Sequence, residues 1–84
     1  MSKWIVAMTL EWEMPVVAET QAEAQRIAEA NASRDLMYTG EEARGFARLV
    51  TKREQLPPSF TGCRAYAERG TTVEDDLIVD EWFK

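Results

Sequence analysis

Apolar and polar residues alternate along the N-terminal part of the chain. The apolar residues at every second position are Trp4, Val6, Met8, Leu10 and Trp12. A period of two is typical of a strand with one buried face. Pro15 has no N–H to donate to a sheet ladder, so the segment must form a bulge, turn into a hairpin or lie at an edge there. We favour one long, bent strand over residues 3–18.

A helix is predicted after this strand. Thr20 and Glu23 have the spacing of a capping box, in which each side chain accepts a hydrogen bond from a backbone N–H that the helix start leaves free. The residues that follow are rich in Ala, Glu, Gln and Arg, and small apolar residues recur on one face as far as Ser33. We predict a helix over 21–33 that packs close to the sheet. The residues expected to meet across this contact are Ala24, Ile27 and Ala28 from the helix and Trp4, Val6, Met8 and Leu10 from the strand.

The middle of the chain has two interpretations. Residues 41–55 can form a helix, since Thr39 and Glu42 repeat the capping-box spacing and apolar residues then share one face. Gly45 opposes this helix, because glycine costs a helix interior about 1 kcal/mol relative to alanine. The segment 45–51 contains the aromatic and branched residues that are typical of a strand, and we favour the strand.

The C-terminal part is predicted to hold a loop and two short strands. Consecutive prolines place 56–59 in a loop, and the alternation over 63–67 is that of a short strand. The apolar residues of 77–83 would point in nearly all directions on a helix, so we favour a terminal strand, with a short helix capped by Thr72 as the alternative. The elements together predict an α+β fold, a small antiparallel or mixed sheet with one main helix packed on one face.

The length of the chain limits it to one hydrophobic core. We treat its 84 residues, 1–84, as a single domain. The composition, 45% hydrophobic and 30% charged, is typical of a globular protein. The chain has a single cysteine, Cys63, and no visible signal peptide or spanning helix. We therefore expect a cytoplasmic protein that does not enter a membrane.

The charge and residue types argue against several classes of function. A formal net charge of −5 has the wrong sign for a phosphate backbone, so we expect no direct nucleic-acid binding. Histidine is absent, which removes the commonest general base and metal ligand, and one cysteine cannot form a thiolate zinc site. We expect neither catalysis, nor a metal, nor a cofactor.

Acidic residues gather near the C-terminus beside aromatic side chains. Carboxylates can steer a domain onto a basic protein surface, and aromatic residues can provide the buried anchor of the interface. The candidate partner-binding residues are Glu11, Glu13, Glu74, Asp75, Asp76, Asp80, Glu81 and Trp82. The alternative interpretation is that the acids are solvated surface and that Trp82 and Phe83 close the core.

A basic set lies in the middle of the chain. Arg44, Arg48 and Lys52 are four residues apart, which places them on one side of either a helix or a strand. The plain interpretation of this set is that its members pair with acids of neighbouring elements.

One part of the sequence carries a resemblance to a group of known proteins. A strand enters a capped helix at 17–28 (VAETQAEAQRIA), and a short strand and 54–58 (EQLPP) follow. This layout resembles small accessory proteins of phages and mobile elements, including anti-CRISPR inhibitors. The resemblance implies an inhibitor that occupies a basic nucleic-acid-binding or subunit surface of a host defence complex. The alternatives are a structural or oligomerisation accessory protein, which includes a homo-oligomer, and a carboxylate-based hydrolase or nuclease.

Overall fold

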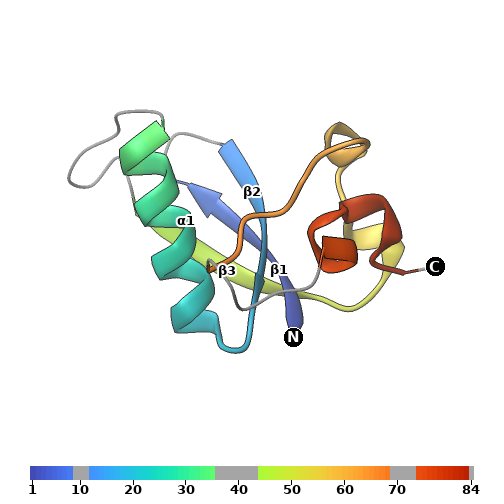
Figure 1. The fold of residues 1–84 in the computed structure, drawn as a ribbon, viewed down its shortest axis with the longest axis horizontal. Helices are drawn as coiled ribbons and strands as arrows, with labels where there is room; N and C mark the ends of the chain where they lie inside the picture. Colours follow the sequence, from blue (N-terminus) through green and yellow to red (C-terminus); the bar gives the residue numbers. More distant parts are fainter. Residues whose placement is uncertain (9–11, 36–43, 69–73, 84) are drawn as a thin grey trace.

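A three-stranded antiparallel sheet with one α-helix on one face is the framework of the protein (Figure 1). The computed structural model describes residues 1–8, 12–35, 44–68 and 74–83. The main elements are β1 (Ser2–Met8), β2 (Trp12–Ala18), α1 (Gln21–Asp35) and β3 (Gly45–Val50). The strand order is β2-β1-β3, so β1 is central. This arrangement confirms the predicted α+β fold with one main helix.

The N-terminal segment is a hairpin, and the prediction of one long strand over 3–18 is wrong. β1 and β2 pair antiparallel from Ser2↔Ala18 to Met8↔Trp12. Each even-numbered residue of β1 faces an even-numbered residue of β2, so the apolar alternation continues from one strand into the next. The pattern therefore could not reveal the turn. Pro15 lies in β2, which is an edge of the three-stranded ladder, as its missing donor requires.

The helix is confirmed, and it packs on the predicted face of the sheet. The Thr20 half of the predicted capping box is present, because the backbone N–H of Glu23 donates to Thr20 Oγ1 at 3.1 Å. The helix runs two residues beyond the predicted end, to Asp35. The buried cluster between helix and sheet includes Trp4, Val6, Met8, Met14, Val16, Ala24, Ile27, Ala28 and Ala32. Leu10, which was expected in this cluster, lies outside the described residues.

The middle segment forms a strand, as favoured from the sequence. β3 pairs antiparallel with β1, from Lys3↔Val50 to Met8↔Gly45. Gly45 and Ala47 are buried on the side of α1, whereas Phe46 and Arg48 face the opposite side and are exposed.

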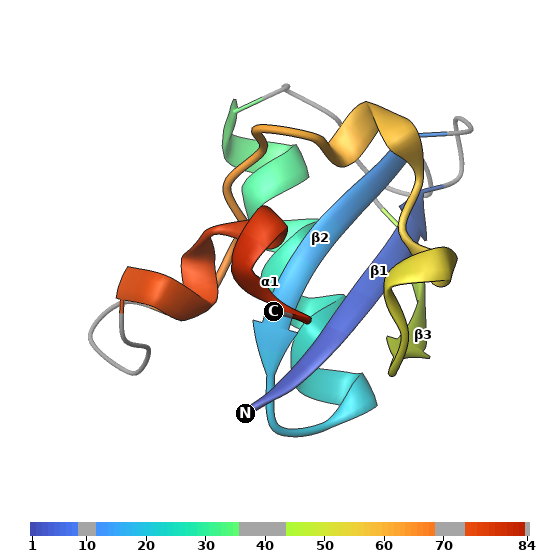
Figure 2. The same cartoon turned by 90° about the vertical axis from the view of Figure 1, so that its right-hand side faces the viewer.

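The sheet face away from α1 is also covered, which the half-buried pattern did not predict. A second cluster contains Ile5, Val17, Val50, Phe60, Ala65 and Val79. Ile5, which the alternation placed on the polar side of its strand, is completely buried. Figure 2, viewed from this side, shows the C-terminal segment in front of the sheet. The sheet is therefore the middle layer of three.

The two strands predicted after residue 60 are absent from the described part of the chain. The segment 63–67 makes only isolated bridges, Val16↔Tyr66 and Arg64↔Ile78. The tail forms two 3-10 turns, Glu74–Leu77 and Val79–Glu81, so the prediction of a terminal strand over 77–83 is wrong. Val79 turns inward to the second cluster, which explains why the apolar residues of the tail follow no strand period. Thr72, the alternative cap, lies outside the described residues.

The predicted loop at 56–59 is confirmed for its first half. Leu56 and Pro57 have extended backbones, as residues that precede prolines do. Pro58 then begins a short 3-10 turn, Pro58–Phe60, because the fixed φ of proline suits the first position of a helical turn. Phe60 is buried by this turn.

Candidate functional site

Four of the predicted partner-binding residues come together in the C-terminal turns. Asp76 lies in the turn Glu74–Leu77, Asp80 and Glu81 lie in the turn Val79–Glu81, and Trp82 follows directly. Glu74 and Asp75 belong to the backbone of the first turn. Glu11 lies outside the described residues.

Glu13 lies apart from this group. Its carboxylate accepts a hydrogen bond from Arg48 Nη2 at 2.6 Å. Glu13 faces Ala7 in the sheet, whereas Asp76 contacts Lys3, four residues earlier on β1 and thus about 13 Å away along the strand. Arg48 therefore pairs with an acid of a neighbouring element, which was the plain interpretation of the basic set.

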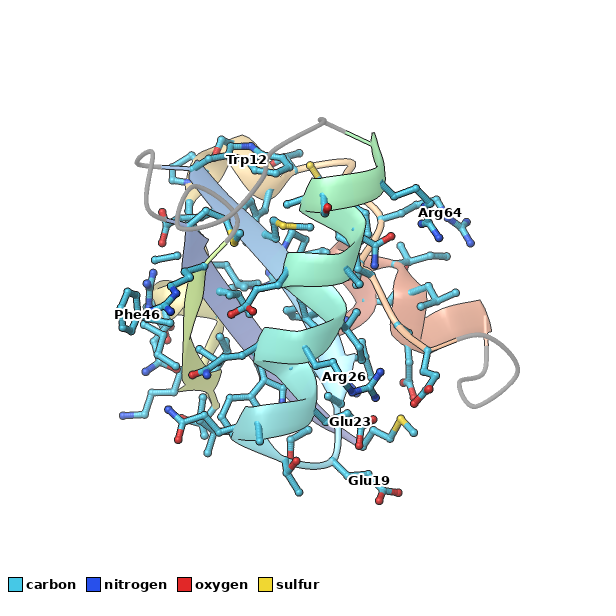
Figure 3. All side chains as sticks on the ribbon, turned by 90° about the vertical axis from the view of Figure 1, so that its left-hand side faces the viewer. Trp12, Glu19, Glu23, Arg26, Phe46 and Arg64 are labelled. Atoms are coloured by element: carbon cyan, nitrogen blue, oxygen red, sulfur yellow. The ribbon has the colours of Figure 1, made fainter. Side chains whose placement is uncertain are left out.

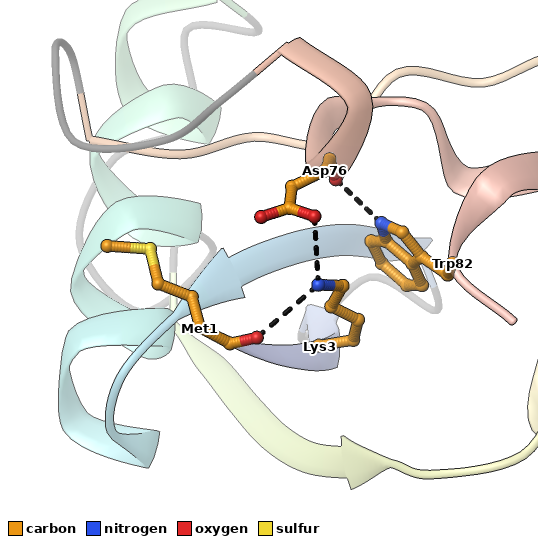
Figure 4. Close-up of polar contacts among 4 residues, drawn as sticks. All are labelled: Met1, Lys3, Asp76 and Trp82. Atoms are coloured by element: carbon orange, nitrogen blue, oxygen red, sulfur yellow. Dashed lines mark hydrogen bonds and ion pairs between the residues drawn. The ribbon is translucent and has the colours of Figure 1, made fainter.

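Asp76 connects the C-terminal tail to the start of β1 through its ion pair with Lys3 (Figure 4). Lys3 Nζ lies 3.3 Å from Asp76 Oδ1 and also donates to the carbonyl of Met1 at 3.3 Å. Trp82 Nε1 donates to the carbonyl of Asp76 at 2.7 Å. Only 16% of the Lys3 side chain is exposed, so Asp76 compensates a cation that is largely withdrawn from water. We assign Asp76 a structural role.

Asp80 and Glu81 are the acidic residues of the turn Val79–Glu81. Both residues are exposed, and Asp80 also accepts a hydrogen bond from the backbone N–H of Gly62 at 3.1 Å. That contact connects the tail to the turn after Pro58–Phe60. These two acids add negative charge to the surface of the described part of the tail.

Two open hollows lie at the C-terminal segment, and Phe83 lines both; Lys3 also lines the first and Asp80 the second. The first has a volume of about 280 Å³, and its apolar lining is Met1, Leu49, Val50, Trp82 and Phe83. The second has a volume of about 430 Å³, and its apolar lining is Leu56, Pro57, Pro58, Phe60, Val79 and Phe83. Arg53 and Asp80 also line the second hollow.

The first hollow is lined by exposed hydrophobic residues. Among the described residues, the large hydrophobic side chains that are exposed are Met1 at 44%, Leu49 at 47% and Phe46 at 71%. Met1 and Leu49 line this hollow, and Leu49 does so from the edge of the sheet, because it pairs with Trp4 and lies on the α1 side of β3. We refer to Met1, Leu49, Asp80, Glu81, Trp82 and Phe83 together as the C-terminal surface.

Sequence reasoning missed Met1 and Leu49 as members of this surface. They reach it because Lys3 pairs with Val50 in the sheet, which places the N-terminus next to the end of β3. No local pattern could have indicated this neighbourhood.

The largest hollow of the described part lies elsewhere, between β2 and the segment 59–66. Its volume is about 740 Å³, and its lining includes Trp12, Pro15, Phe60 and Tyr66. Glu13 and Arg64 also line it, so it carries one charge of each sign. The hollow lined by Arg53 and Asp80 has the same balance, so the charges of the lining alone do not distinguish these two hollows.

Both edges of the sheet are occupied by other parts of the chain. At the β2 edge, the Val17 N–H donates to the Tyr66 carbonyl and the Tyr66 N–H donates to the Pro15 carbonyl, both at 2.9 Å. At the β3 edge, side chains of α1 bind the backbone. Glu29 and Gln25 accept from the N–H groups of Gly45 and Ala47, at 3.0 and 3.2 Å, and Gln21 donates to the Ala47 carbonyl at 2.8 Å. A partner therefore meets side chains rather than an open strand edge.

Metal-ligating side chains are dispersed in the described part of the chain. No group of three or more Cys, Asp or Glu residues there could hold a metal ion. Cys63 is half-buried, and its thiol donates to the Ser59 carbonyl at 3.4 Å. Within the same residues, no helix is long and apolar enough to cross a membrane.

The fold and this surface define the protein as a small α+β domain with an acidic and apolar C-terminal end. The chain matches no protein-family model, no curated protein sequence and no solved structure. Its function is therefore argued from the geometry of its own surface.

Proposed function

We propose that this domain is a non-enzymatic protein-binding module that places its C-terminal surface on a basic site of a protein partner. One observation carries the proposal. Two hollows with both apolar and polar walls share Phe83, the carboxylate residue Asp80 lines one of them, and Glu81 is an exposed neighbour of Trp82 and Phe83 in the chain.

This combination suits side chains that have an apolar stem and a cationic tip. Arginine and lysine bury their methylene stems along apolar surface while their charged ends stay in water. The stems fit hollows of this size, and the charged ends can reach Asp80 or Glu81 at the rim. Trp82 is held in place by its bond to Asp76, so little side-chain freedom is lost on binding.

The whole-molecule charge supports the same kind of partner. The net charge of −5 attracts a positive surface over a distance and speeds association. Basic surfaces of this kind occur where proteins hold nucleic acid. We therefore extend the proposal to a phage-encoded inhibitor that occupies a nucleic-acid-binding or subunit surface of a host defence complex such as CRISPR-Cas.

The test reverses the two exposed acids of the C-terminal surface. Asp80→Lys together with Glu81→Lys should abolish capture of the main partner that wild type retains from a bacterial lysate. Asp76 is left intact, because a lysine there would face Lys3 and disturb the fold. Exposed charges contribute less than about 1 kcal/mol each to stability, so the variant should stay folded.

The matched control makes the same change in net charge on the other side of the molecule. Glu19→Lys, Ala30→Lys and Ser33→Lys together make this change at exposed positions before and along α1, which covers the opposite face of the sheet, and they leave the acidic residue Glu23 at the helix start in place (Figure 3). This control should keep the partner at low salt and lose it as salt rises, since the Debye length falls from about 10 Å at 0.1 M to about 3 Å at 1 M. Equal loss in both variants, or in neither, would refute a binding role for the C-terminal surface.

A further inference from the structure

Phe46 is the most exposed large hydrophobic side chain in the described part of the chain. It is 71% exposed, and it is the second residue of β3. Figure 3 shows it projecting outward from β3 at the margin of the molecule. A single exposed apolar residue is common on folded proteins, so Phe46 supports an interface only together with the residues around it.

The surroundings of Phe46 contain charges of both signs. Phe46 and Glu13 both face Ala7 of the central strand, so the three side chains lie on one face of the sheet. Arg48, two residues along β3, lies on the same face and reaches across to Glu13. We refer to Ala7, Glu13, Phe46 and Arg48 as the Phe46 patch. Ala7 has a shorter side chain than the residues around it, so the centre of the patch is less raised than its rim.

The ion pair within the patch can make further bonds. Its contact joins Arg48 Nη2 to Glu13 Oε2. A guanidinium has five N–H donors and a carboxylate has two oxygens, so donors and an acceptor remain for a second molecule. The two side chains are 52% and 34% exposed, which keeps these atoms within reach.

We propose that the Phe46 patch is a two-fold interface through which two copies of this chain form a dimer. A patch that holds both an arginine and a glutamate is complementary to itself, because a two-fold rotation can bring Arg48 of each copy to Glu13 of the other. A patch for an acidic or a basic partner would carry one sign of charge. Phe46 supplies the apolar contact, and the ion pairs set the orientation.

The dimer should be weak and reversible. An interface built around one aromatic side chain per copy buries less than the roughly 1,200 Å² of standard complexes. We expect a dissociation constant of about 10 to 100 µM, so that dimers form at millimolar concentration and separate at low micromolar concentration.

A pair of opposite charge variants tests the proposal directly. Glu13→Arg gives a patch with two positive side chains, and Arg48→Glu gives a patch with two negative ones. Sedimentation equilibrium should show each variant as a monomer when alone, and a 1:1 mixture should form a heterodimer at least as tight as the wild-type dimer. A mixture that contains only monomers would overturn the proposal. If Glu13 and Arg48 act only within their own chain, mixing the two variants should not restore dimer formation.

A second pair of variants removes apolar contacts instead. Phe46→Ser should raise the dimer dissociation constant at least about tenfold. Leu49→Ser, on the same strand but in the C-terminal surface, should leave the dimer unchanged and weaken partner capture. A wild-type chain that is monomeric at 1 mM, or equal effects of the two serine variants on dimerisation, would refute this interface. The proposed partner binding would be unaffected by that result, since Phe46→Ser leaves the C-terminal surface intact.

Discussion

Gly45 lies at the point where β3 packs most closely on the core side of β1. A Cβ atom at this position would lie 2.5 Å from Val6 Cγ1 and 3.1 Å from Met8 Sδ. Val6 is β-branched and fully buried, so it cannot rotate away without strain. The low helix propensity of Gly45 favoured a strand over a helix in the sequence. The close packing of this strand also requires a glycine at this position.

We expect Gly45→Ala to lower the free energy of unfolding by about 1 to 3 kcal/mol, as overpacking of a tight core does. Urea denaturation followed by circular dichroism measures this loss. The control Glu54→Ala changes an exposed residue and should stay within about 0.5 kcal/mol of wild type. A wild-type midpoint for Gly45→Ala would show that Val6 and Met8 have room to move.

The sequence predicted correctly which residues of β1 face the helix, but it misjudged the other face. Trp4, Val6 and Met8 alternate with Ile5 and Ala7, and only the first set looked buried. Ile5 is buried because Phe60 and Val79 cover it, and these residues are more than fifty positions away in the chain. The pairing of Glu13 with Arg48 depends on a similarly distant neighbour. Single-residue burial could therefore be predicted only on the side that one local helix covers.

At the level of elements, α1 protects the edge of β3 as well as burying a face of the sheet. Gln21, Gln25 and Glu29 are four residues apart, so they form one row along the helix. This row binds the outward backbone groups of Gly45 and Ala47. A row of unpaired groups at a strand edge is a template for pairing with another chain, and the helix side chains satisfy it.

We expect Gln25→Leu combined with Glu29→Leu to expose this edge. Two buried or half-buried N–H groups would lose their acceptors, at a cost of about 1 to 3 kcal/mol each. Thermal unfolding should begin earlier, and light scattering should show aggregation through β3. Ser33→Ala, an exposed change on the same helix, serves as the control. A double variant that melts like wild type and stays dispersed would mean that the row has no protective role.

The elements that could be predicted are those with local signals. The capping box and the alanine-rich face lie within α1 itself, and the branched and aromatic residues lie within β3. The tail was predicted wrongly because its conformation depends on remote bonds. Val79 N–H donates to the Cys63 carbonyl at 3.3 Å, and Ala65 N–H donates to the Leu77 carbonyl at 2.7 Å. A local period cannot encode such contacts.

On the scale of the whole molecule, the two ends of one sheet face have different surfaces. The C-terminal segment covers the end near Lys3 and Val50, where it adds apolar hollows and exposed acids. The other end, near Ala7, keeps Phe46 exposed beside a balanced ion pair. The candidate acids could be predicted as a charge cluster from the sequence. The apolar half of the C-terminal surface could not, because the sheet register alone brings Leu49 and Met1 to Phe83.

The central claim is that the C-terminal surface is the site of partner binding, and amide hydrogen exchange of this protein with and without its captured partner tests it most directly. The 3-10 turns of the tail hold few bonds, such as Trp82 N–H to the Val79 carbonyl at 3.1 Å, so they should open and exchange readily in the free protein. We predict that the partner slows exchange over 77–83 and leaves α1 unchanged. Slowed exchange confined to α1 or to 63–67, with 77–83 unaffected, would contradict the claim.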